Sequence, residues 1–286
     1  MSKSNMLLGL AKGKVGDLVF YRDGGEQRTR TRVVPKNPRT PAQMAQRVKM
    51  ANVSALYRTL SNVLSESFTN RPSNQSGYNA FAAQAIALAP YQTKEMAAVD
   101  VVLPQPCFAS KGVLPALPLE GDFTGEAPYG VSLLGSYGST TPTIAQVSKD
   151  LVDNYSNFQY GDKLAFVGVR FTASDVEVGG VAVYTPLLIV DVLELSSSNT
   201  ESLGSTSFSV TDNVLSTDMF VTLAEGEVGM AAIIHSRVNE NGQLETTSQM
   251  FQLTPSAQTL YDAHRTQQAL EEAVQSYMAG SESILR

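Results

Sequence analysis

Three arginines occupy alternate positions near the start of the chain, in the stretch RTRTRVV, as Arg28, Arg30 and Arg32. Alternate residues of a β-strand face the same way and lie ~6.6–6.8 Å apart, close to the spacing of phosphates along an extended single strand of nucleic acid. The guanidinium groups could therefore bind successive phosphates, or they could clamp the carboxylates of a neighbouring subunit bidentately. Tyr21 is expected on the same face, where its ring could stack on a base.

Further cations would extend this positive field, and they are Lys12, Lys14, Arg39, Arg47 and Lys49. Residues 1–50 hold 11 of the 21 lysines and arginines against three acids, a local charge of +8, whereas the whole chain carries −6 and the remainder −14. This separation predicts a basic arm that meets an acidic partner, either nucleic acid or another protein. A basic segment lying on the chain's own acidic body, or on an acidic neighbouring subunit, would explain the same pattern.

A β-hairpin is predicted to position the arginines. The runs DLVFY and TRTRVV are rich in β-branched and aromatic residues, and DGG between them suits a tight turn. Whichever two residues form the turn, Asp17, Val19 and Tyr21 then share a face with the three arginines, because side chains alternate along a strand.

A helix is predicted directly after the hairpin. Thr40 is the expected N-cap, Pro41 the first helical residue and Gln43 the partner in a capping box. An apolar stripe at helical spacing carries this helix to about Glu66. A second helix, SGYNAFAAQAIALA, is expected to stop at Pro90 and to pair with the first.

The rest of the chain changes character twice. Residues 99–143 are rich in proline and glycine, so little regular structure is expected there. A short helix is predicted in TPTIAQVSKDLVDNY, with Thr141 as its cap and Pro142 first. Short strands follow, and a hairpin turn is expected at ENGQ. The expected strands are KLAFVGVRF, VEVGGVAVY, LLIVDVLEL, TSFSVTD, MFVTLA, VGMAAIIHSRV and LETTSQMFQL.

The predicted fold class is α+β, with an N-terminal β-hairpin plus helical pair, a mainly antiparallel β central domain of sandwich or barrel type, and a C-terminal helix. We expect a basic hairpin-plus-helices module over 1–98, a connecting segment over 99–143, a β-rich domain over 144–254 and the helical end over 255–286. The last helix is expected from Pro255 to Met278. Its apolar stripe could pack on the β domain or on another subunit.

Few residues suggest catalysis or metal binding. Cys107 is the single cysteine, and His235 and His264 are the only histidines, neither at ligand spacing from another donor. The stretch LGLAKGKV lacks the first glycine and the Ser/Thr of a phosphate-binding loop. No apolar run approaches the ~18 residues of a membrane span, and the first residues lack the form of a signal peptide. We therefore expect a soluble protein made in the cytoplasm, with no enzymatic activity, cofactor or metal.

The opening resembles a family of uncharacterised proteins, a domain of unknown function from phages and prophages of gut Bacteroidetes. The resemblance rests on GKVGDLVFYRDGGEQRTRTR followed by PKNPRTPAQMAQR. The family pattern there is Asn-Pro-x-Thr-x-x-Gln-x-x-Gln-Arg, matched by Asn37, Pro38, Thr40, Gln43, Gln46 and Arg47. The likeness covers about the first 60 residues, and YGDKLAFV is its best piece beyond them. It implies association with phages and a role in the virion or its assembly, and it brings no catalytic residues.

The expected function is that of a non-enzymatic structural component of a phage virion, present in several copies and made in the bacterial host cytoplasm. The expected partners are other copies of the chain and other virion proteins, with nucleic acid as a further candidate, and no membrane. The alternative is a single-strand nucleic-acid-binding protein that acts in phage replication or packaging.

Overall fold

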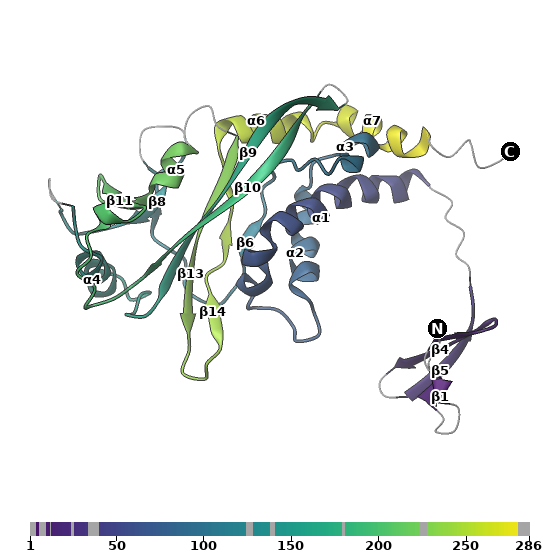
Figure 1. The fold of residues 1–286 in the computed structure, drawn as a ribbon, viewed down its shortest axis with the longest axis horizontal. Coiled ribbons are helices and arrows are strands. Elements are labelled where there is room, and N and C mark those ends of the chain that lie inside the picture. The colour runs from purple at the N-terminus through teal and green to yellow at the C-terminus, as the bar shows by residue number, and fades with distance from the viewer. Residues whose placement is uncertain are drawn as a thin grey trace. The chain divides into compact units, whose positions relative to one another are not determined.

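Contacts within the chain divide it into two units, Met1–Thr40 and Pro41–Arg286. The structure is a computed structural model (Figure 1), and it describes residues 4–5, 10–11, 13–23, 26–33, 40–123, 128–137, 141–178, 181–223 and 228–279. The expected boundary at residue 98 does not coincide with this division, because the helices before it share one hydrophobic core with strands of the later sheet.

The described chain contains both helices and strands. The helices, with two short 3₁₀ turns, are α1 (Pro41–Ser67), α2 (Gly77–Ala85), η2 (Ile86–Leu88), α3 (Lys94–Ala98), α4 (Ile144–Asn154), η3 (Leu203–Ser205), α5 (Asp218–Thr222), α6 (Pro255–Ala263) and α7 (Gln267–Met278). The strands are β1 (Ser4–Asn5), β2 (Leu10–Ala11), β3 (Gly13–Val15), β4 (Leu18–Asp23), β5 (Glu26–Thr31), β6 (Phe108–Ser110), β7 (Leu119–Glu120), β8 (Gly130–Ser132), β9 (Lys163–Val178), β10 (Val181–Glu194), β11 (Phe208–Thr211), β12 (Val214–Thr217), β13 (Gly229–Val238), β14 (Leu244–Thr246), β15 (Gln249–Met250) and β16 (Gln252–Leu253).

The fold class is α+β, as predicted, and the named strands pair antiparallel throughout the described residues. The largest sheet has five strands in the order β10-β9-β13-β14, with β16 also paired to β13. A four-stranded sheet has the order β11-β12-β8-β7, and the N-terminal unit contains the three-stranded sheet β3-β4-β5.

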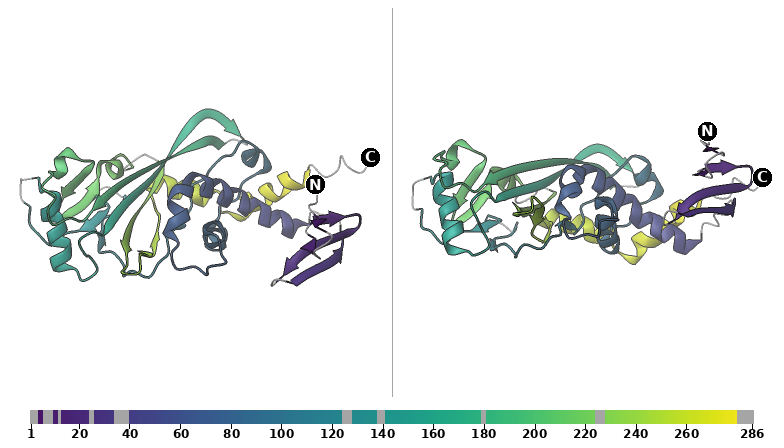
Figure 2. Two further views of the ribbon diagram at one scale, coloured as in Figure 1. Left: turned by 60° about the horizontal axis from the view of Figure 1, so that its bottom comes forward. Right: turned by 90° about the horizontal axis from the view of Figure 1, so that it is seen from below.

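The two faces of the five-stranded sheet are buried by different partners (Figure 2). Along β9, Val167 and Val169 face a core shared with α1 and α2. The alternate residues Leu164 and Phe166 face a second core, which the four-stranded sheet and α4 complete. The strands are therefore apolar on both faces, as in sheets covered on both sides.

The helical pair forms where the sequence indicates it. Helix α1 begins at Pro41 and ends at Ser67, close to the expected limits. Helix α2 is capped by Ser76, whose side chain accepts a hydrogen bond from the backbone N–H of Asn79. Their facing side chains are buried together, so packing stabilises both helices.

Buried amide side chains hold the proline-rich segment against α1 without a strand ladder. Asn52 on α1 is completely buried; its Nδ2 donates to Leu103 O at 3.1 Å, and its Oδ1 accepts from Leu103 N at 2.9 Å. Gln92 and Gln105 bond the same amide at 2.9 and 2.8 Å. These groups satisfy backbone atoms that would otherwise be buried without partners.

The cap of α4 differs from the prediction. The N-cap is Thr143, not Thr141. Thr143 Oγ1 accepts from Gln146 N at 3.3 Å, and Gln146 Oε1 accepts from Thr143 N at 2.9 Å. Only Thr143 has a glutamine three residues later, so only it can form the reciprocal capping box.

The expected single tail helix consists of two helices, α6 and α7. The first ends with His264 as its C-cap, and Thr266 caps the second. Between them, the Arg265 guanidinium donates to Ala89 O at 2.9 Å and contacts the ring of Tyr91. Helix α6 contacts β13 and β16, whereas α7 contacts α1 and α3. The tail therefore packs on this chain, against the β-sheet with its first helix and against other helices with its second.

Two predictions about strands are wrong in detail. The run MFVTLA contains helix α5, and the segments expected as three short strands form one long hairpin, β9 and β10. An apolar run buried on all sides has no period that separates strand from helix. Pro186 did not end the strand because β10 lies at the edge of its sheet, where proline is tolerated.

Candidate functional site

The predicted arginine-bearing hairpin exists and is part of a three-stranded sheet. Strand β5 pairs with β4 so that Tyr21 lies opposite Arg28 and Val19 opposite Arg30. Residues directly opposite each other in an antiparallel pair share a face, so these four side chains lie on one face, as expected. Pairing of Asp23 with Glu26 leaves two residues for the turn, and they lie outside the described part.

Strand β3 was not predicted, and it adds a cation to the same face. It pairs with β4 so that Lys14 lies opposite Val19, which places Lys14, Val19 and Arg30 in one row across the sheet. The connection consists of Gly16 and Asp17, and Gly16 has φ +59. Glycine at the first position of a two-residue loop is a hairpin signal that GKVGD contained.

Arg32 continues the alternation past the end of β5. Its backbone N–H donates to Asp17 O at 2.6 Å, which extends the pairing of β5 with β4 by one residue. The guanidinium carbon of Arg30 lies 5.7 Å from the centre of the Tyr21 ring. This diagonal cation–π contact orients the ring, and it means that a base stacking on that side must first displace Arg30.

We name the surface formed by Lys14, Tyr21, Arg28, Arg30 and Arg32 the cationic face. All five side chains are exposed to solvent. Arg28 and Arg30 come from β5 and Arg32 directly follows it, whereas Lys14 comes from β3 at the opposite edge of the sheet. The face can therefore bind anionic groups spread over a surface, and not only along a line.

The opposite face of this sheet is apolar and also poorly covered. Val15 is 51% and Leu18 46% exposed, and Phe20 is half-buried beside them. Among the described residues of Met1–Thr40, none belongs to a hydrophobic core cluster. The sheet therefore has two chemically different faces and no interior of its own.

The remaining predicted site residues are not part of this sheet. Lys12 and Arg39 lie outside the described residues. Arg47 and Lys49 belong to α1 in the second unit, where Arg47 is exposed and Lys49 half-buried. Burial and the charge of Glu95 raise the pKa of Tyr277 on α7, and the charge of Arg47 opposes this shift in part.

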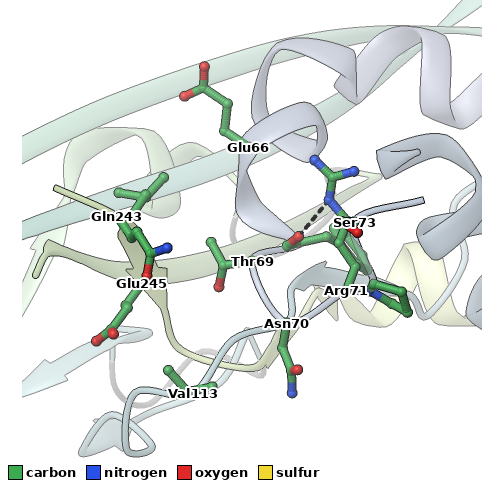
Figure 3. A pocket seen from close by; sticks show the side chains of 11 residues that line it. Glu66, Thr69, Asn70, Arg71, Ser73, Val113, Gln243 and Glu245 are labelled. Carbon is green, nitrogen blue, oxygen red and sulfur yellow. Dashed lines mark hydrogen bonds between the residues drawn. The ribbon is translucent and has the colours of Figure 1, made fainter. Parts of the chain in front are cut away.

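A pocket of about 480 Å³ lies in the second unit, where the end of α1 and the following loop meet β14 (Figure 3). Glu66 and Glu245 lie on different sides of it. Glu66 belongs to α1 and is exposed, and Glu245 belongs to β14 and is half-buried. The Arg71 Nε donates to Phe68 O at 3.0 Å, and Asn239 Nδ2 donates to Glu245 at 2.9 Å. Arg71 and Glu245 thus stabilise the local fold, and we assign no chemistry to the pocket.

A buried charged cluster formed by Asp162, His235 and Arg237 was not predicted from the sequence. The Asp162 carboxylate, only 2% exposed, lies 2.8 Å from His235 Nε2 and accepts two hydrogen bonds from Arg237 at 2.7 Å. The Gln159 backbone N–H donates to it at 2.8 Å. The ring of Phe158 packs on the imidazole, with centroids 5.0 Å apart.

This cluster joins the turn before β9 to the neighbouring strand β13. Burial alone would raise the pKa of Asp162, but the hydrogen bonds from Arg237, His235 and the Gln159 backbone lower it to about 2. One sequence feature could have indicated the cluster: His235 and Arg237 are alternate residues of one strand and so share a face, where an acid such as Asp162 of YGDK could pair with both. We assign the cluster a structural role, because all four hydrogen bonds stay within the fold.

The other residues considered for chemistry are also accounted for. Cys107 is buried, and burial raises the pKa of its thiol far above the usual range. Burial likewise lowers the pKa of His264. Within the described ranges, no group of three or more histidine, cysteine and acidic side chains is arranged to hold a metal ion. None of the described helices is long and apolar enough to cross a membrane.

No family model, curated protein or solved structure matches this chain.

Proposed function

We propose that the chain is a non-enzymatic structural component of a phage virion, present in several copies, whose N-terminal sheet docks on partner subunits or on packaged nucleic acid. One observation carries the docking role: the sheet β3-β4-β5 presents a cationic face and an apolar face, and none of its described side chains belongs to a core cluster.

The energetics of a small sheet support this proposal. A few strands without a packed hydrophobic face are marginally stable in water, because the ordered backbone loses entropy that no burial offsets. The exposed Val15 and Leu18 are the side chains whose burial against another surface would supply that stabilisation. A docking element is expected to be built in this way.

The assignment to phages rests on the sequence resemblance of the first 60 residues, and the place of action that follows is the virion. Proteins of such particles occur in many copies and contact each other over extended surfaces. A basic arm on an acidic body suits contacts between copies, since the chain carries −6 overall but +8 within residues 1–50.

The second candidate is a single-strand nucleic-acid-binding protein of phage replication or packaging. The observation that favours it is the shared face of Tyr21, Arg28 and Arg30, which combines an aromatic ring with cations at about the spacing of phosphates. The contact of Arg30 with the Tyr21 ring argues for the structural role instead, because it occupies a ring face that a base would need.

Replacing Arg28, Arg30 and Arg32 together by glutamine separates the two candidates. If the cations bind subunit carboxylates, assembly fails while nucleic-acid affinity barely changes. If they bind a single strand, the slope of log affinity against log salt falls by about 2, at ~0.7 per phosphate contact. We expect the first result.

A matched control removes three lysines from the second unit, K94Q/K149Q/K163Q, and should change neither quantity. Mass spectrometry of purified virions tests the location directly. A triple arginine variant that assembles normally and keeps its salt slope, together with virions that lack the protein, would exclude both candidates.

A further inference from the structure

Strand β10 forms one edge of the five-stranded sheet. It pairs with β9 over its whole length, and no other strand follows it in the sheet order. Figure 1 shows the two strands as long ribbons that run from the side of α4 to the side of α3. At the α3 end, Val183 and Tyr184 pack against a small core around Met96. From Leu188 onward, none of the described strands pairs with the outer edge of β10.

The ladder shows which backbone groups of β10 point outward. Leu195, directly after β10, uses both its groups inward: its N–H donates to Asp162 O at 2.8 Å, and its C=O accepts from Gly161 N at 2.7 Å. The register has no shift between Tyr184 and Glu194, so the odd-numbered residues of this stretch bond β9. The even-numbered residues Leu188, Val190, Val192 and Glu194 therefore direct N–H and C=O away from the sheet.

Pro186 fits this assignment. It is an even-numbered residue, so its nitrogen faces the open side, where the lost donor does not interrupt the pairing with β9. In the part of the chain that the structure describes, no hydrogen bond joins the outward groups of Leu188, Val190 and Val192 to other residues. A row of alternating donors and acceptors at strand spacing is complementary to another β-strand.

The side chains of this edge are apolar and accessible. Val190 is 40% and Val192 52% exposed, and Leu187 on the other face is 54% exposed. β10 contains no lysine or arginine, and its acids are Asp191 and Glu194. Monomeric proteins protect long edge strands with charges, and above all with lysine, because such edges otherwise recruit further strands.

We infer that β10 pairs antiparallel with β10 of a second copy about a twofold axis at Val190, which joins the two five-stranded sheets into one. In this register Val190 lies opposite its own copy, and Leu188 lies opposite Val192. The outward groups of these residues then bond each other reciprocally. The apolar side chains on the helix-covered face come into contact across the axis.

The charge pattern is compatible with a second copy as the partner. The proposed register places Asp191 opposite Ile189 and Glu194 opposite Pro186, so no acid lies directly opposite another, and the two Asp191 side chains meet only as diagonal neighbours. It also places Pro186 at the ends of the new ladder, where a missing donor costs least. A twofold axis makes any strand complementary to itself, and isologous pairs are the commonest contacts between copies of a chain.

The inference does not depend on the proposed function, since it uses another surface. Val190→Pro tests it, because this change removes an outward donor and leaves the inward bonds to β9 intact. We expect sedimentation equilibrium of the full chain to show a dimer for the wild type and a dissociation constant raised tenfold or more for V190P. Val190→Thr keeps the donor and the shape, and it should remain dimeric. The R28Q/R30Q/R32Q variant should also remain dimeric.

Cross-linking provides a second measurement that does not depend on tolerance of proline. The one native cysteine, Cys107, is buried, so Val190→Cys adds the only accessible thiol in the described part of the chain. A short bismaleimide should join V190C copies into dimers. Val238→Cys is the control, because Val238 is 65% exposed on another strand of the same sheet. A monomeric wild type, or equal cross-linking of both variants, overturns the inference.

Discussion

Replacing Asp162 by asparagine should be among the most destabilising isosteric changes in the second unit. The side chain keeps its size, but the carboxylate that accepts hydrogen bonds from Arg237, His235 and the Gln159 backbone is lost. The new amide nitrogen would point at one of these donors. Arg237 would then keep its charge next to a neutral, partly mismatched partner.

The magnitude follows from two arguments. A pKa of about 2 in the folded chain, against 3.8 for a free carboxyl group, corresponds to about 2 kcal/mol of stability from the ionised form. Removing one partner of a buried ion pair costs ~3–5 kcal/mol when the other charge stays buried, and Arg237 is 19% exposed, so the lower end applies. We expect the free energy of unfolding to fall by about 3 kcal/mol.

Urea denaturation of the full chain at neutral pH measures this loss as a shift of the midpoint at unchanged slope. Asp153→Asn is the matched control, because Asp153 makes an exposed ion pair with Lys149 on α4. It should leave the midpoint near that of the wild type. If D162N shifts the midpoint no more than D153N, the cluster is not a significant source of stability and the reasoning is refuted.

The stability difference between wild type and D162N should depend on pH. Because folding lowers the pKa of Asp162, its contribution is fully present above the unfolded pKa of 3.8 and is lost as the pH falls through about 2. The difference in stability between wild type and D162N should therefore be constant near neutral pH and shrink between about pH 4 and pH 2. A difference that persists unchanged to pH 2 would contradict the role of the ionised carboxylate.

Three smaller effects follow from other contacts. Thr143→Ala should cost about 1 kcal/mol in thermal denaturation, whereas Thr141→Ala should cost little, and equal effects would place the cap elsewhere. Arg265→Lys keeps the charge but loses the fork that bonds the carbonyls after α2, so it should cost about 1–2 kcal/mol, while Arg58→Lys in an exposed ion pair should be silent. Gly112→Ala would place its Cβ 1.9 Å from the backbone carbonyl oxygen of Thr246, so it should destabilise by about 1–3 kcal/mol or prevent folding; wild-type stability would mean that the segment after β6 lies further from β14.

Local signals predicted a large part of the fold. The start of α1 followed from the Thr-Pro pair and the end from the apolar stripe, because both depend on residues within one or two turns. The shared face of Tyr21, Arg28 and Arg30 followed from alternation, which any strand imposes on its side chains. The α+β class followed from the change of hydrophobic period along the chain.

The failures lie where the partner is distant in sequence. The run MFVTLA is mostly apolar and too short to show a period, so its place in the second core, through Met219, Phe220 and Leu223, decided that it is helical. Asp162 lies in the turn before β9, which is a local feature, but its ion pair requires β13 to lie beside β9, a contact over more than 70 residues. The continuity of β10 through Pro186 depends on which strand occupies the sheet edge.

The sequence by itself therefore determined the local elements, the uneven charge and the alternation that gathers the arginines on one face. Only the tertiary structure decided that β3 adds Lys14 to that face, that the described side chains of the N-terminal sheet join no core cluster, and that β10 is an edge strand. The physical reason is the range of the interactions. Caps, turns and periodicity act within a few residues, whereas strand order and burial depend on how distant apolar segments share the available core.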